Sequence, residues 1–237
     1  MPEFQELWPG GPVFAQAEHF RLSTDSLLLA DFIRPGGARR GIDLGCGSGV
    51  LTLLLLERSE TLHMTGLELL EEAAAVARAN LAANALSSRG EIVCGDIRAV
   101  RQGFDAGSFD LVAANPPYYP LGRGARAPRE ERAAARSELN CTLEELCAAA
   151  AFLCRTGGRF FLVHKPERLS EVFVCMHEHS LEPKRLRLVC AAADRSASLA
   201  LIEGRRGGGS GLAIEPPLLL TGPDGGESEE LRRICHR

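Results

Sequence analysis

The chain has 237 residues, of which 45% are hydrophobic and 24% are charged, and its formal net charge is −4. This length allows one large α/β domain, because a domain averages roughly 150 residues, and the balanced composition excludes disorder over most of the chain. The sequence contains no apolar run close to the ~18 residues of a membrane span and no signal-peptide pattern, so we expect a cytoplasmic protein.

Strand-like and helix-like segments alternate along the first half of the chain. Thr24 or Asp25 is expected to be the N-cap of an apolar helix over residues 26–33, and residues 1–40 are expected to form a lid on the domain. Beyond them, strands are predicted at 41–44, 62–67, 91–94 and 109–114, with helices at 50–57 and 71–85. This alternation predicts a parallel sheet with helices on both faces.

The second half of the chain continues the pattern after a loop. Four prolines and two glycines exclude regular structure over residues 116–128. The elements expected next are a helix over 130–154 that ends before Gly157 and Gly158, a strand at 159–164, a helix at 167–179, and strands near 186–190 and 198–204. Residues 205–237 form a C-terminal extension with a short strand pair at most and a charged tail. We therefore predict a Rossmann-like α/β domain of about seven mostly parallel strands, with its core in residues 41–204.

The segment IDLGCGSGV, residues 42–50, joins a strand, a glycine turn and a helix. Its glycines, Gly45, Gly47 and Gly49, are one residue short of the dinucleotide fingerprint GxGxxG, which seats a pyrophosphate. Asp43 precedes them, where a carboxylate repels a pyrophosphate and attracts a cation. Because glycines also let a ligand approach the backbone, the turn is predicted to bind an amino acid moiety with an ammonium group.

Two further carboxylates follow predicted strands. Glu68 ends the second strand, where an acidic side chain can bind both ribose hydroxyls of an adenosine. Asp96 follows the third strand and is predicted to face the adenine edge, although an Asp after Gly is also an ordinary turn residue. Since ligands of open α/β sheets bind beyond the carboxyl ends of the strands, these residues together predict a site for S-adenosylmethionine.

The fourth predicted strand ends in Asn115, Pro116, Pro117 and Tyr118. An exocyclic amino nitrogen is a weak nucleophile because its lone pair is delocalised, so a site has to accept its N–H groups and orient it. The Asn115 oxygen and the Pro116 carbonyl can accept these bonds, and Tyr118 can stack on a base. With the glycine turn, this NPPY motif resembles that of class I S-adenosylmethionine-dependent methyltransferases that methylate planar amide or amino nitrogens.

Four more segments resemble the bacterial valine tRNA adenine-N6 methyltransferases: HFRLSTDSLLLADF (19–32), VHKPERL (163–169), EPKRLRLV (182–189) and LALIEGRRGGGSGLAIEPPLLL (199–220). This resemblance covers nearly the whole chain, and it implies a tRNA substrate methylated on the adenine just 3′ of the anticodon. It implies that the base is held by the catalytic residues Asn115, Pro116, Pro117 and Tyr118. The residues predicted to bind the cofactor are Thr24, Asp25, Asp43, Gly45, Gly47, Gly49, Glu68, Asp96 and Asn115.

Binding of tRNA would depend on local basic patches, since the acidic net charge gives no global positive field. Candidate phosphate contacts are Arg123, Arg126, Arg129, Lys184, Arg185 and Arg187. Glu130, Glu131 and Glu138 alternate with the first group, so a solvated helix face with ion pairs is an equal alternative.

No metal site is expected from the cysteines and histidines. The eight cysteines are scattered without a CxxC pair, so we predict reduced thiols, with Cys147 and Cys154 packed as small hydrophobes. The histidines, among them His63, His164, His177 and His179, show no metal-like spacing with carboxylates.

Two rival functions use parts of the same pattern. A release-factor glutamine methyltransferase relies on the same NPPY site, because an amide also presents two planar N–H donors. That family carries an extra N-terminal helical domain, for which we expect the residues before Gly41 to be too few. The other rival is a non-catalytic, cofactor-dependent RNA-binding module, against which the intact NPPY motif argues.

Overall fold

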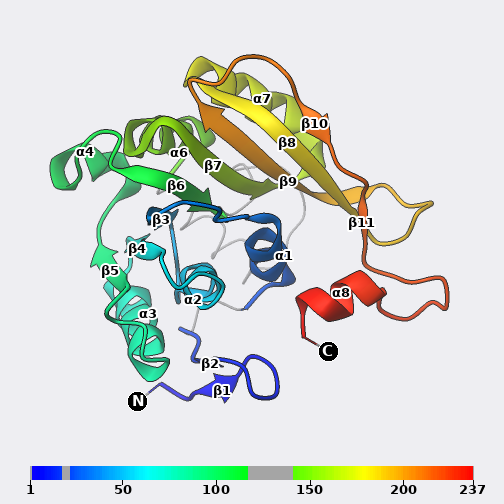
Figure 1. Ribbon diagram of the computed structural model, residues 1–237, viewed down its shortest axis with the longest axis horizontal. Coiled ribbons are helices and arrows are strands. Elements are labelled where there is room, and N and C mark those ends of the chain that lie inside the picture. The colour runs from blue at the N-terminus through cyan, green and yellow to red at the C-terminus, as the bar shows by residue number, and fades with distance from the viewer. Residues whose placement is uncertain (1, 18–21, 117–140, 237) are drawn as a thin grey trace, which may run out of the picture.

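The computed structural model describes residues 2–17, 22–116 and 141–236. Its centre is a nine-stranded sheet with the order β10-β8-β9-β7-β6-β3-β4-β5, in which β11 also pairs with β8 (Figure 1). Seven long strands dominate it: β3 (Arg40–Leu44), β4 (His63–Glu68), β5 (Gly90–Cys94), β6 (Phe109–Ala114), β7 (Cys154–His164), β8 (Leu181–Cys190) and β9 (Ala197–Arg206). β3 to β7 run parallel, and β9 is antiparallel to both β7 and β8. The predicted Rossmann-like sheet of about seven mostly parallel strands is confirmed.

Helices cover both faces of the sheet, each over its own apolar core. One core joins the sheet to α1 (Thr24–Phe32), α2 (Val50–Glu57), α3 (Glu71–Ala83) and α8 (Glu229–Ile234). The other joins it to α4 (Val100–Gly103), α6 (Leu143–Leu153) and α7 (Leu169–Glu178). In β7, Phe161 and Val163 point into the first core while Phe160 and Leu162 point into the second. This alternation follows from the two-residue period of a strand.

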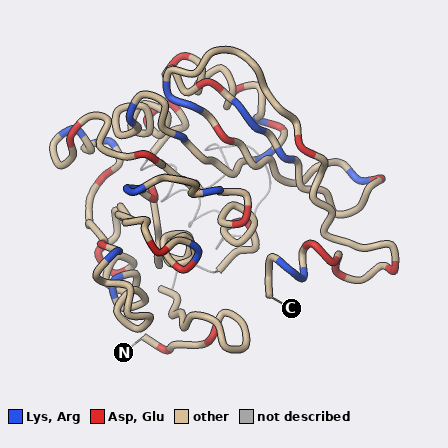
Figure 2. Tube along the Cα trace, in the orientation of Figure 1, with Lys and Arg blue, Asp and Glu red and all other residues tan. Residues whose placement is uncertain are grey.

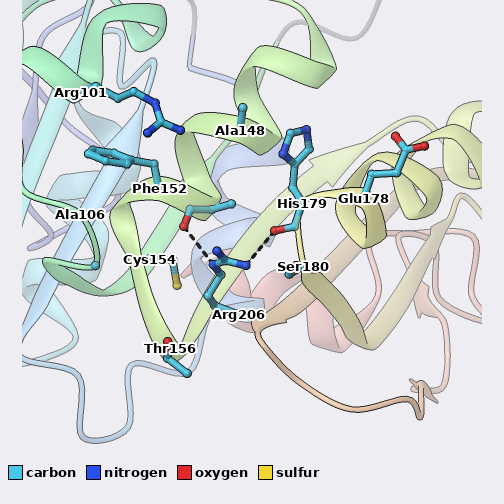
Figure 3. A pocket seen from close by; sticks show the side chains of 12 residues that line it. Arg101, Ala106, Ala148, Phe152, Cys154, Thr156, Glu178, His179, Ser180 and Arg206 are labelled. Carbon is cyan, nitrogen blue, oxygen red and sulfur yellow. Dashed lines mark hydrogen bonds between the residues drawn. The ribbon is translucent and has the colours of Figure 1, made fainter.

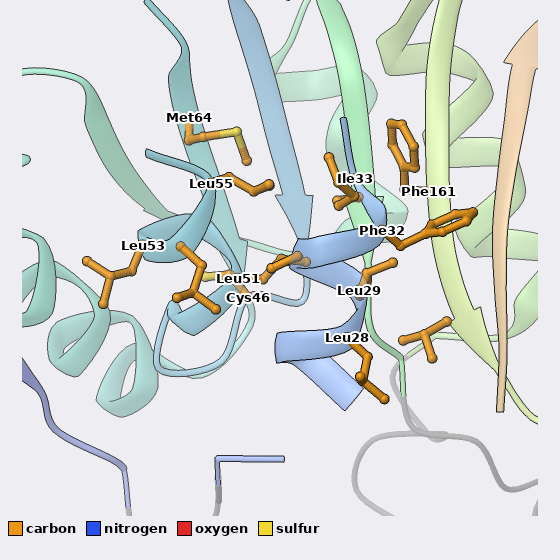
Figure 4. Packing of buried hydrophobic residues seen from close by; sticks show 14 of the residues in the cluster. Leu28, Leu29, Phe32, Ile33, Cys46, Leu51, Leu53, Leu55, Met64 and Phe161 are labelled. Carbon is orange, nitrogen blue, oxygen red and sulfur yellow. The ribbon is translucent and has the colours of Figure 1, made fainter. Parts of the chain in front are cut away.

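The first core brings α1 and α2 together on the same side of β3 and β7 (Figure 4). Leu28, Leu29 and Phe32 of α1 are buried, and the Phe32 ring meets Phe161 of β7 edge-on, with ring centroids 6.3 Å apart. Every residue of α2 from Leu51 to Leu56 is buried, which explains why this helix reads as a continuous apolar run. The second half of α1 is thereby fixed to the sheet.

The N-terminal segment is attached through two asparagines of the α3 region. β1 (Gln5–Glu6) and β2 (Val13–Phe14) form a separate hairpin. The Asn84 side chain accepts from the amide of Val13 at 2.9 Å and donates to its carbonyl at 2.7 Å. Asn80, which is fully buried, does the same for Ala15 and also donates to the carbonyl of Ser48 at 2.8 Å. These bonds tie the N-terminal segment to the turn that precedes α2.

The C-terminal residues extend the sheet beyond β8. β10 (Ala213–Ile214) and β11 (Leu218–Leu219) each pair with β8 in parallel. The extension thus holds two short strands, within the predicted limit of a short strand pair, but they bond to β8 and not to each other. α8 follows, and His236 stacks on Trp8 of the N-terminal hairpin with ring centroids 3.9 Å apart. None of the helices described is both long and apolar enough to cross a membrane.

Most element boundaries differ from the prediction by one to several residues, and three of the differences concern residues that were given a role. α1 begins at Thr24 with Ser23 as its N-cap, so Thr24 and Asp25 lie in the first turn. α6 begins at Leu143, because Thr142 and Glu145 form a capping box with bonds of 3.2 and 2.7 Å, so no continuous helix spans 130–154. Gly157 and Gly158 lie inside β7, where Gly157 takes a φ of +75° beside a register shift between β6 and β7. Such irregular pairing lets glycines remain within a strand.

Candidate functional site

The register of the parallel strands brings three predicted site residues to one edge of the sheet. Leu44 of β3 lies opposite Ala114 of β6 and Leu67 of β4, so Gly45 and Asn115 leave neighbouring strands at the same level. Glu68 is the last residue of β4 and lies opposite Cys94 of β5. The polar residues that follow three strands in the sequence are therefore close together at the carboxyl end of the sheet, where open α/β sheets bind ligands.

The glycine turn has a conformation that requires its glycines. Gly45, Gly47 and Gly49 have φ values of +74°, +55° and +82°. The amides of Gly45 and Cys46 both donate to the carbonyl of Leu67 of β4, at 2.8 and 3.1 Å. Gly45 is exposed, and a Cβ added there would meet only Ile97 Cδ1 at 3.9 Å. The backbone at Gly45 is thus open to a ligand that approaches closely.

Gly49 serves a different purpose from the one predicted. A Cβ at this position would lie 3.0 Å from the Ala77 Cβ of α3. Gly49 is buried and is the N-cap of α2, with a left-handed φ. It is therefore required for packing of the turn against α3, and its predicted contact with a ligand is not supported.

Glu68 holds the glycine turn from β4. Its carboxylate accepts from the amide of Gly47 at 2.8 Å and from the amide of Leu70 at 2.9 Å. The residue is only 5% exposed. A carboxylate has about four acceptor positions, so two neutral backbone donors fix its orientation without using its full capacity. Glu68 can therefore accept further hydrogen bonds from a ligand hydroxyl.

Asp43 is buried beneath the same turn. It is 1% exposed and accepts from Thr52 Oγ1 of α2 at 2.9 Å. Burial raises its pKa to about 7, and the hydrogen bonds from Thr52 offset only part of this effect. A positive ligand group nearby would favour the charged form of Asp43. Its environment fits the predicted preference for a cation.

Asp96 has the turn role that the sequence left open. It is the N-cap of η1 (Ile97–Ala99) and accepts from the amide of Arg98 at 2.8 Å. The Arg98 guanidinium also binds its carboxylate, with Nε 3.0 Å from Oδ1, and this hydrogen-bonded pair lowers the pKa of Asp96. An adenine contact by Asp96 has no support in this geometry.

Asn115 is oriented by a serine that the sequence analysis missed. Its Nδ2 donates to Ser26 Oγ of α1 at 2.9 Å, and Ser26 is buried. The bond directs the amide nitrogen of Asn115 toward α1. It thereby identifies which terminal atom of the side-chain amide is the nitrogen and which is the oxygen. Thr24 and Asp25 directly precede Ser26 in the first turn of the same helix. Pro116 follows Asn115 at the edge, whereas Pro117 and Tyr118 lie outside the described residues.

The arginines predicted to bind RNA on β8 have structural partners instead. The Arg185 side chain is 11% exposed and forms ion pairs with Glu203 at 2.8 Å and Glu215 at 3.1 Å. Arg187 pairs with Glu230 of α8 at 2.9 Å and is 17% exposed. Blue and red segments accordingly lie side by side along β8 and β9 in Figure 2. Both arginines thus have acidic partners within the chain, and their phosphate contacts stay a prediction.

Lys184 differs from these two arginines. Its Nζ donates to the carbonyls of Gly209 and Ser210, at 2.9 and 3.3 Å, so its partners are neutral. The other predicted contacts, Arg123, Arg126 and Arg129, lie outside the described residues. Their role in RNA binding stays a prediction.

Two missed residues connect the site to its surroundings. Thr52 binds Asp43 from α2, and Asn80 binds the carbonyl of Ser48 within the glycine turn. Both are fully buried polar residues inside helices. A buried polar side chain has to be hydrogen-bonded, so Thr52, the lone polar residue within the apolar stretch of α2, offered a signal, whereas Asn80, two residues after Arg78, offered none.

These residues fit S-adenosylmethionine in three respects. Gly45 presents an open backbone, Glu68 offers a fixed carboxylate at the end of β4, and Asp43 offers a second carboxylate whose charged form a cation would favour. Amino acid, ribose and sulfonium groups together require such an arrangement of acceptors and open backbone.

Comparison with known proteins places the chain in a family. Residues 11–179 match the family model described as the methyltransferase small domain. A protein of Escherichia coli O157:H7 named tRNA1(Val) (adenine(37)-N6)-methyltransferase is 34% identical over 155 residues, which are 65% of this chain and 61% of that protein. The match thus spans about three fifths of that relative. A protein of the same name from Shewanella sp. (strain MR-4) is 29% identical over 89% of this chain and 88% of its own length.

A solved structure shows the same fold. A predicted O-methyltransferase from Agrobacterium tumefaciens superposes with a TM-score of 0.72 over 90% of this chain and 95% of its own, at 22% identity. The sheet and its two layers of helices are therefore those of a known methyltransferase fold.

Proposed function

The chain belongs to the methyltransferase small domain family, whose cofactor is S-adenosylmethionine, and we propose that it methylates the exocyclic N6 of an adenine in tRNA. The position of Asn115 carries this proposal: it follows β6 directly beside Gly45, and Ser26 holds its amide nitrogen. The names of the relatives from Escherichia coli and Shewanella support adenine 37 of a valine tRNA as the target.

The cofactor would be held by the glycine turn and the two buried carboxylates. Gly45 would lie against it, Glu68 would accept from its ribose hydroxyls, and Asp43 would attract its positive charge. When bound, the cofactor supplies an electrophilic methyl group on a sulfonium. Because Glu68 also accepts from the amide of Gly47, occupation of the ribose site would be coupled to the conformation of the turn.

The target base would be held at the end of β6. Since Nδ2 of Asn115 donates to Ser26, its carbonyl end is the one that can accept an N–H of the adenine amino group. The Pro116 carbonyl would accept the other N–H, and the two acceptors would direct the nitrogen lone pair toward the methyl carbon. Held in this way, the nitrogen would be placed to receive the methyl group from the bound cofactor, with S-adenosylhomocysteine as the leaving group, and it would lose its proton to water afterwards.

Three further proposals accompany this function. We propose that residues 1–40 act as a lid over the core in residues 41–204, that residues 205–237 are an extension of it, and that the protein acts in the cytoplasm. The bonds from Asn80 to Ala15 and Ser48 support the first, because they couple the N-terminal segment to the glycine turn.

One experiment tests the proposal and separates the rivals. Unmodified total tRNA and purified release factor are incubated separately with the chain and labelled S-adenosylmethionine, and the labelled nucleoside or amino acid is mapped by mass spectrometry. Label in N6-methyladenosine supports the proposal. Label in a glutamine of release factor, or binding of RNA and cofactor without transfer, would replace it by one of the alternatives.

The variant Asn115→Ala tests the base site separately. We expect kcat to fall by roughly two to three orders of magnitude, as for loss of one preorganised polar group, while affinity for S-adenosylhomocysteine is unchanged. Gln102→Ala, which removes an exposed amide side chain of α4 outside the proposed site, is the control and should keep its turnover. Turnover retained by Asn115→Ala would mean that another group orients the nitrogen.

A further inference from the structure

Three side chains of different ligand types meet between α6 and α7, away from the glycine turn. Glu144 Oε1 lies 2.7 Å from His179 Nε2, and Glu144 Oε2 lies 3.4 Å from Cys175 Sγ. One carboxylate oxygen, the thiol sulfur and the imidazole nitrogen all lie within 4.8 Å of one another. No part of the proposed methyl transfer uses them.

The local sequence explains how the cluster forms. Cys175 and His179 are four residues apart at the end of α7, so both side chains are on one face of the helix. Glu144 lies in the first turn of α6, and the Cys175 thiol also donates to the carbonyl of Leu143 at 3.5 Å. α6 and α7 pack on the same face of the sheet, so these three positions are fixed by the second apolar core.

The cluster is accessible from two surface hollows. His179 lines a cavity of about 560 Å³, together with Phe152 and Arg206 (Figure 3). Glu144 and Cys175 line a second hollow of about 400 Å³. Glu178 lines both. A small ion and its water could therefore reach the three ligand atoms from solvent.

Two of the three ligand separations come close to those around a tetrahedral cation, and the third lies within 4.8 Å. Zinc binds thiolate sulfur at about 2.3 Å and imidazole nitrogen or carboxylate oxygen at about 2.0–2.2 Å, which separates neighbouring ligand atoms by roughly 3.3–3.6 Å. The separation of Cys175 Sγ and Glu144 Oε2, 3.4 Å, already has this value. The pair His179 Nε2 and Glu144 Oε1, now 2.7 Å apart, would open by roughly half an ångström. The Glu144 side chain is 63% exposed and can make this movement.

We propose that Glu144, Cys175 and His179 bind a divalent cation of the zinc type, with water in the fourth position. A thiolate and an imidazole favour zinc over magnesium or calcium, which prefer oxygen ligands alone. Binding releases the proton of the Cys175 thiol to solvent, because the thiolate is the ligand. The ion would replace the two hydrogen bonds of Glu144 by stronger bonds and so fasten α6 to α7.

Cobalt titration of the whole chain tests this site. The reduced protein is freed of metal with a chelator and titrated with Co²⁺, whose thiolate charge-transfer and visible d–d bands report tetrahedral sulfur ligation. We expect one equivalent to bind, and zinc to displace the cobalt. Absence of the charge-transfer band would overturn the proposal and leave Glu144 as a hydrogen-bonding link between two helices.

Matched variants identify the ligands. Cys175→Ser should abolish the charge-transfer band, whereas Cys190→Ser removes another buried thiol and should retain it. His179→Asn should weaken binding by more than the roughly 10- to 100-fold that loss of an outer-shell partner costs, while His177→Asn, on the same helix, should not. Glu144→Gln, at an exposed position, keeps the shape of the side chain and should weaken binding without affecting folding. Equal binding by the test and control variants would overturn the assignment.

A readout independent of colour completes the test. Bound zinc should raise the melting temperature and protect Cys175 from alkylation, as mapped by mass spectrometry, and neither effect should occur in Glu144→Gln. Because none of these measurements uses tRNA or S-adenosylmethionine, their failure is distinguishable from failure of the proposed methyl transfer.

Discussion

Two regions of the sheet bury charged side chains, and they treat the charge in opposite ways. At the carboxyl edge of β3 and β4, the carboxylates of Asp43 and Glu68 accept from neutral donors: a threonine hydroxyl and two backbone amides. On β8, Arg185 meets two glutamates and the carbonyl of Phe32, over whose ring its guanidinium lies at 3.9 Å. The first region keeps an excess of negative charge, while the second balances its charge internally.

This difference distinguishes the proposed ligand site from a structural region. A buried charge without an opposite charge is costly, and the raised pKa of Asp43 is a direct sign of that cost. Such a cost is recovered when a cationic ligand binds, which suits the sulfonium and ammonium of S-adenosylmethionine. An ion pair such as Arg185 and Glu203 is already neutralised, so binding of a charged ligand would not stabilise it further. We therefore assign these residues of β8 a structural role in the fold.

The largest expected effect is loss of cofactor binding in Gly45→Val. The new side chain would occupy the open space at the turn and would adopt an unfavourable φ of +74°. We expect calorimetry to detect no binding of S-adenosylhomocysteine and no increase in melting temperature upon its addition. Full affinity in a folded variant would show that the cofactor binds elsewhere.

Gly49→Val is the comparison for that variant. Its Cβ would approach the Ala77 Cβ to 3.0 Å, and its φ of +82° is equally unfavourable. We expect destabilisation of about 1–3 kcal/mol in chemical denaturation. Unlike Gly45→Val, a folded fraction of Gly49→Val should still bind the cofactor.

Next in size is the effect of Arg185→Met on stability. Removing the guanidinium would leave the partly buried carboxylates of Glu203 and Glu215 without this positive partner. We expect this change to lower the free energy of unfolding by about 3–5 kcal/mol. Arg34→Met is the matched control, because Arg34 also pairs with Glu215, at 3.2 Å, yet its side chain is 72% exposed. The control should cost less than about 1 kcal/mol. Similar losses in both variants would contradict the structural role of Arg185.

The sequence was sufficient for the parts of the molecule that depend on local pattern. α2 and β6 have the predicted bounds, and the edge containing Asp43, Gly45, Glu68 and Asn115 follows from parallel strands that end in polar residues. The Thr142 to Glu145 capping box was readable as T-L-E-E but was overlooked, which is why the start of α6 was wrong. Asp96 needed the structure, since nothing local distinguishes a turn residue from a ligand contact.

What the sequence did not predict depends on distant partners. Arg185 reads as a surface cation until Glu203 and Glu215 are placed beside it by strand pairing and the C-terminal extension. The spacing of Cys175 and His179 was visible, but Glu144 lies 31 residues before Cys175 and only helix packing brings it there. Pairing of two-residue strands with β8 is likewise a tertiary outcome, because such short segments have no strand pattern of their own.

A smaller and pH-dependent effect is expected for Asp43→Asn. The pKa of Asp43 is about 7 in the folded chain against an ordinary 3.8, so between these values the folded state binds more protons than the unfolded state. The contribution of Asp43 to the free energy of unfolding of the wild type therefore falls as the pH rises from about 4 to about 7, and it is constant above pH 7. The variant lacks this titrating group. Its free energy of unfolding relative to that of the wild type should therefore rise by at most about 4 kcal/mol between pH 4 and pH 8.

Ligand binding should reverse the ranking of these two proteins. Asp43→Asn removes the charge that attracts a cation, so it should bind S-adenosylmethionine more weakly than wild type does at pH 8. Denaturation curves from pH 4 to pH 8, with and without the cofactor, measure both effects. Parallel pH profiles for wild type and variant would mean that Asp43 titrates at its ordinary value.

The smallest expected effect concerns Lys184 and the salt dependence of tRNA binding. Each phosphate contact contributes about 0.7–0.9 to the slope of log K against log salt, so Lys184→Gln should make the slope shallower by no more than this amount. Among the predicted cations of β8, Lys184 has only carbonyl groups as described partners, so no carboxylate neutralises its charge. The charge of Arg187, by contrast, is neutralised by Glu230. Arg187→Gln should therefore lower stability and leave the slope unchanged, when binding is measured by fluorescence anisotropy below the melting temperature.

The double variant Arg126→Gln, Arg129→Gln should reduce the slope by about 1.4–1.8 if both bind phosphates. A change in slope with Arg187→Gln but none with Lys184→Gln would mean that the charge pairing on β8 opens to receive RNA, and the contrast between the two buried regions would then fail.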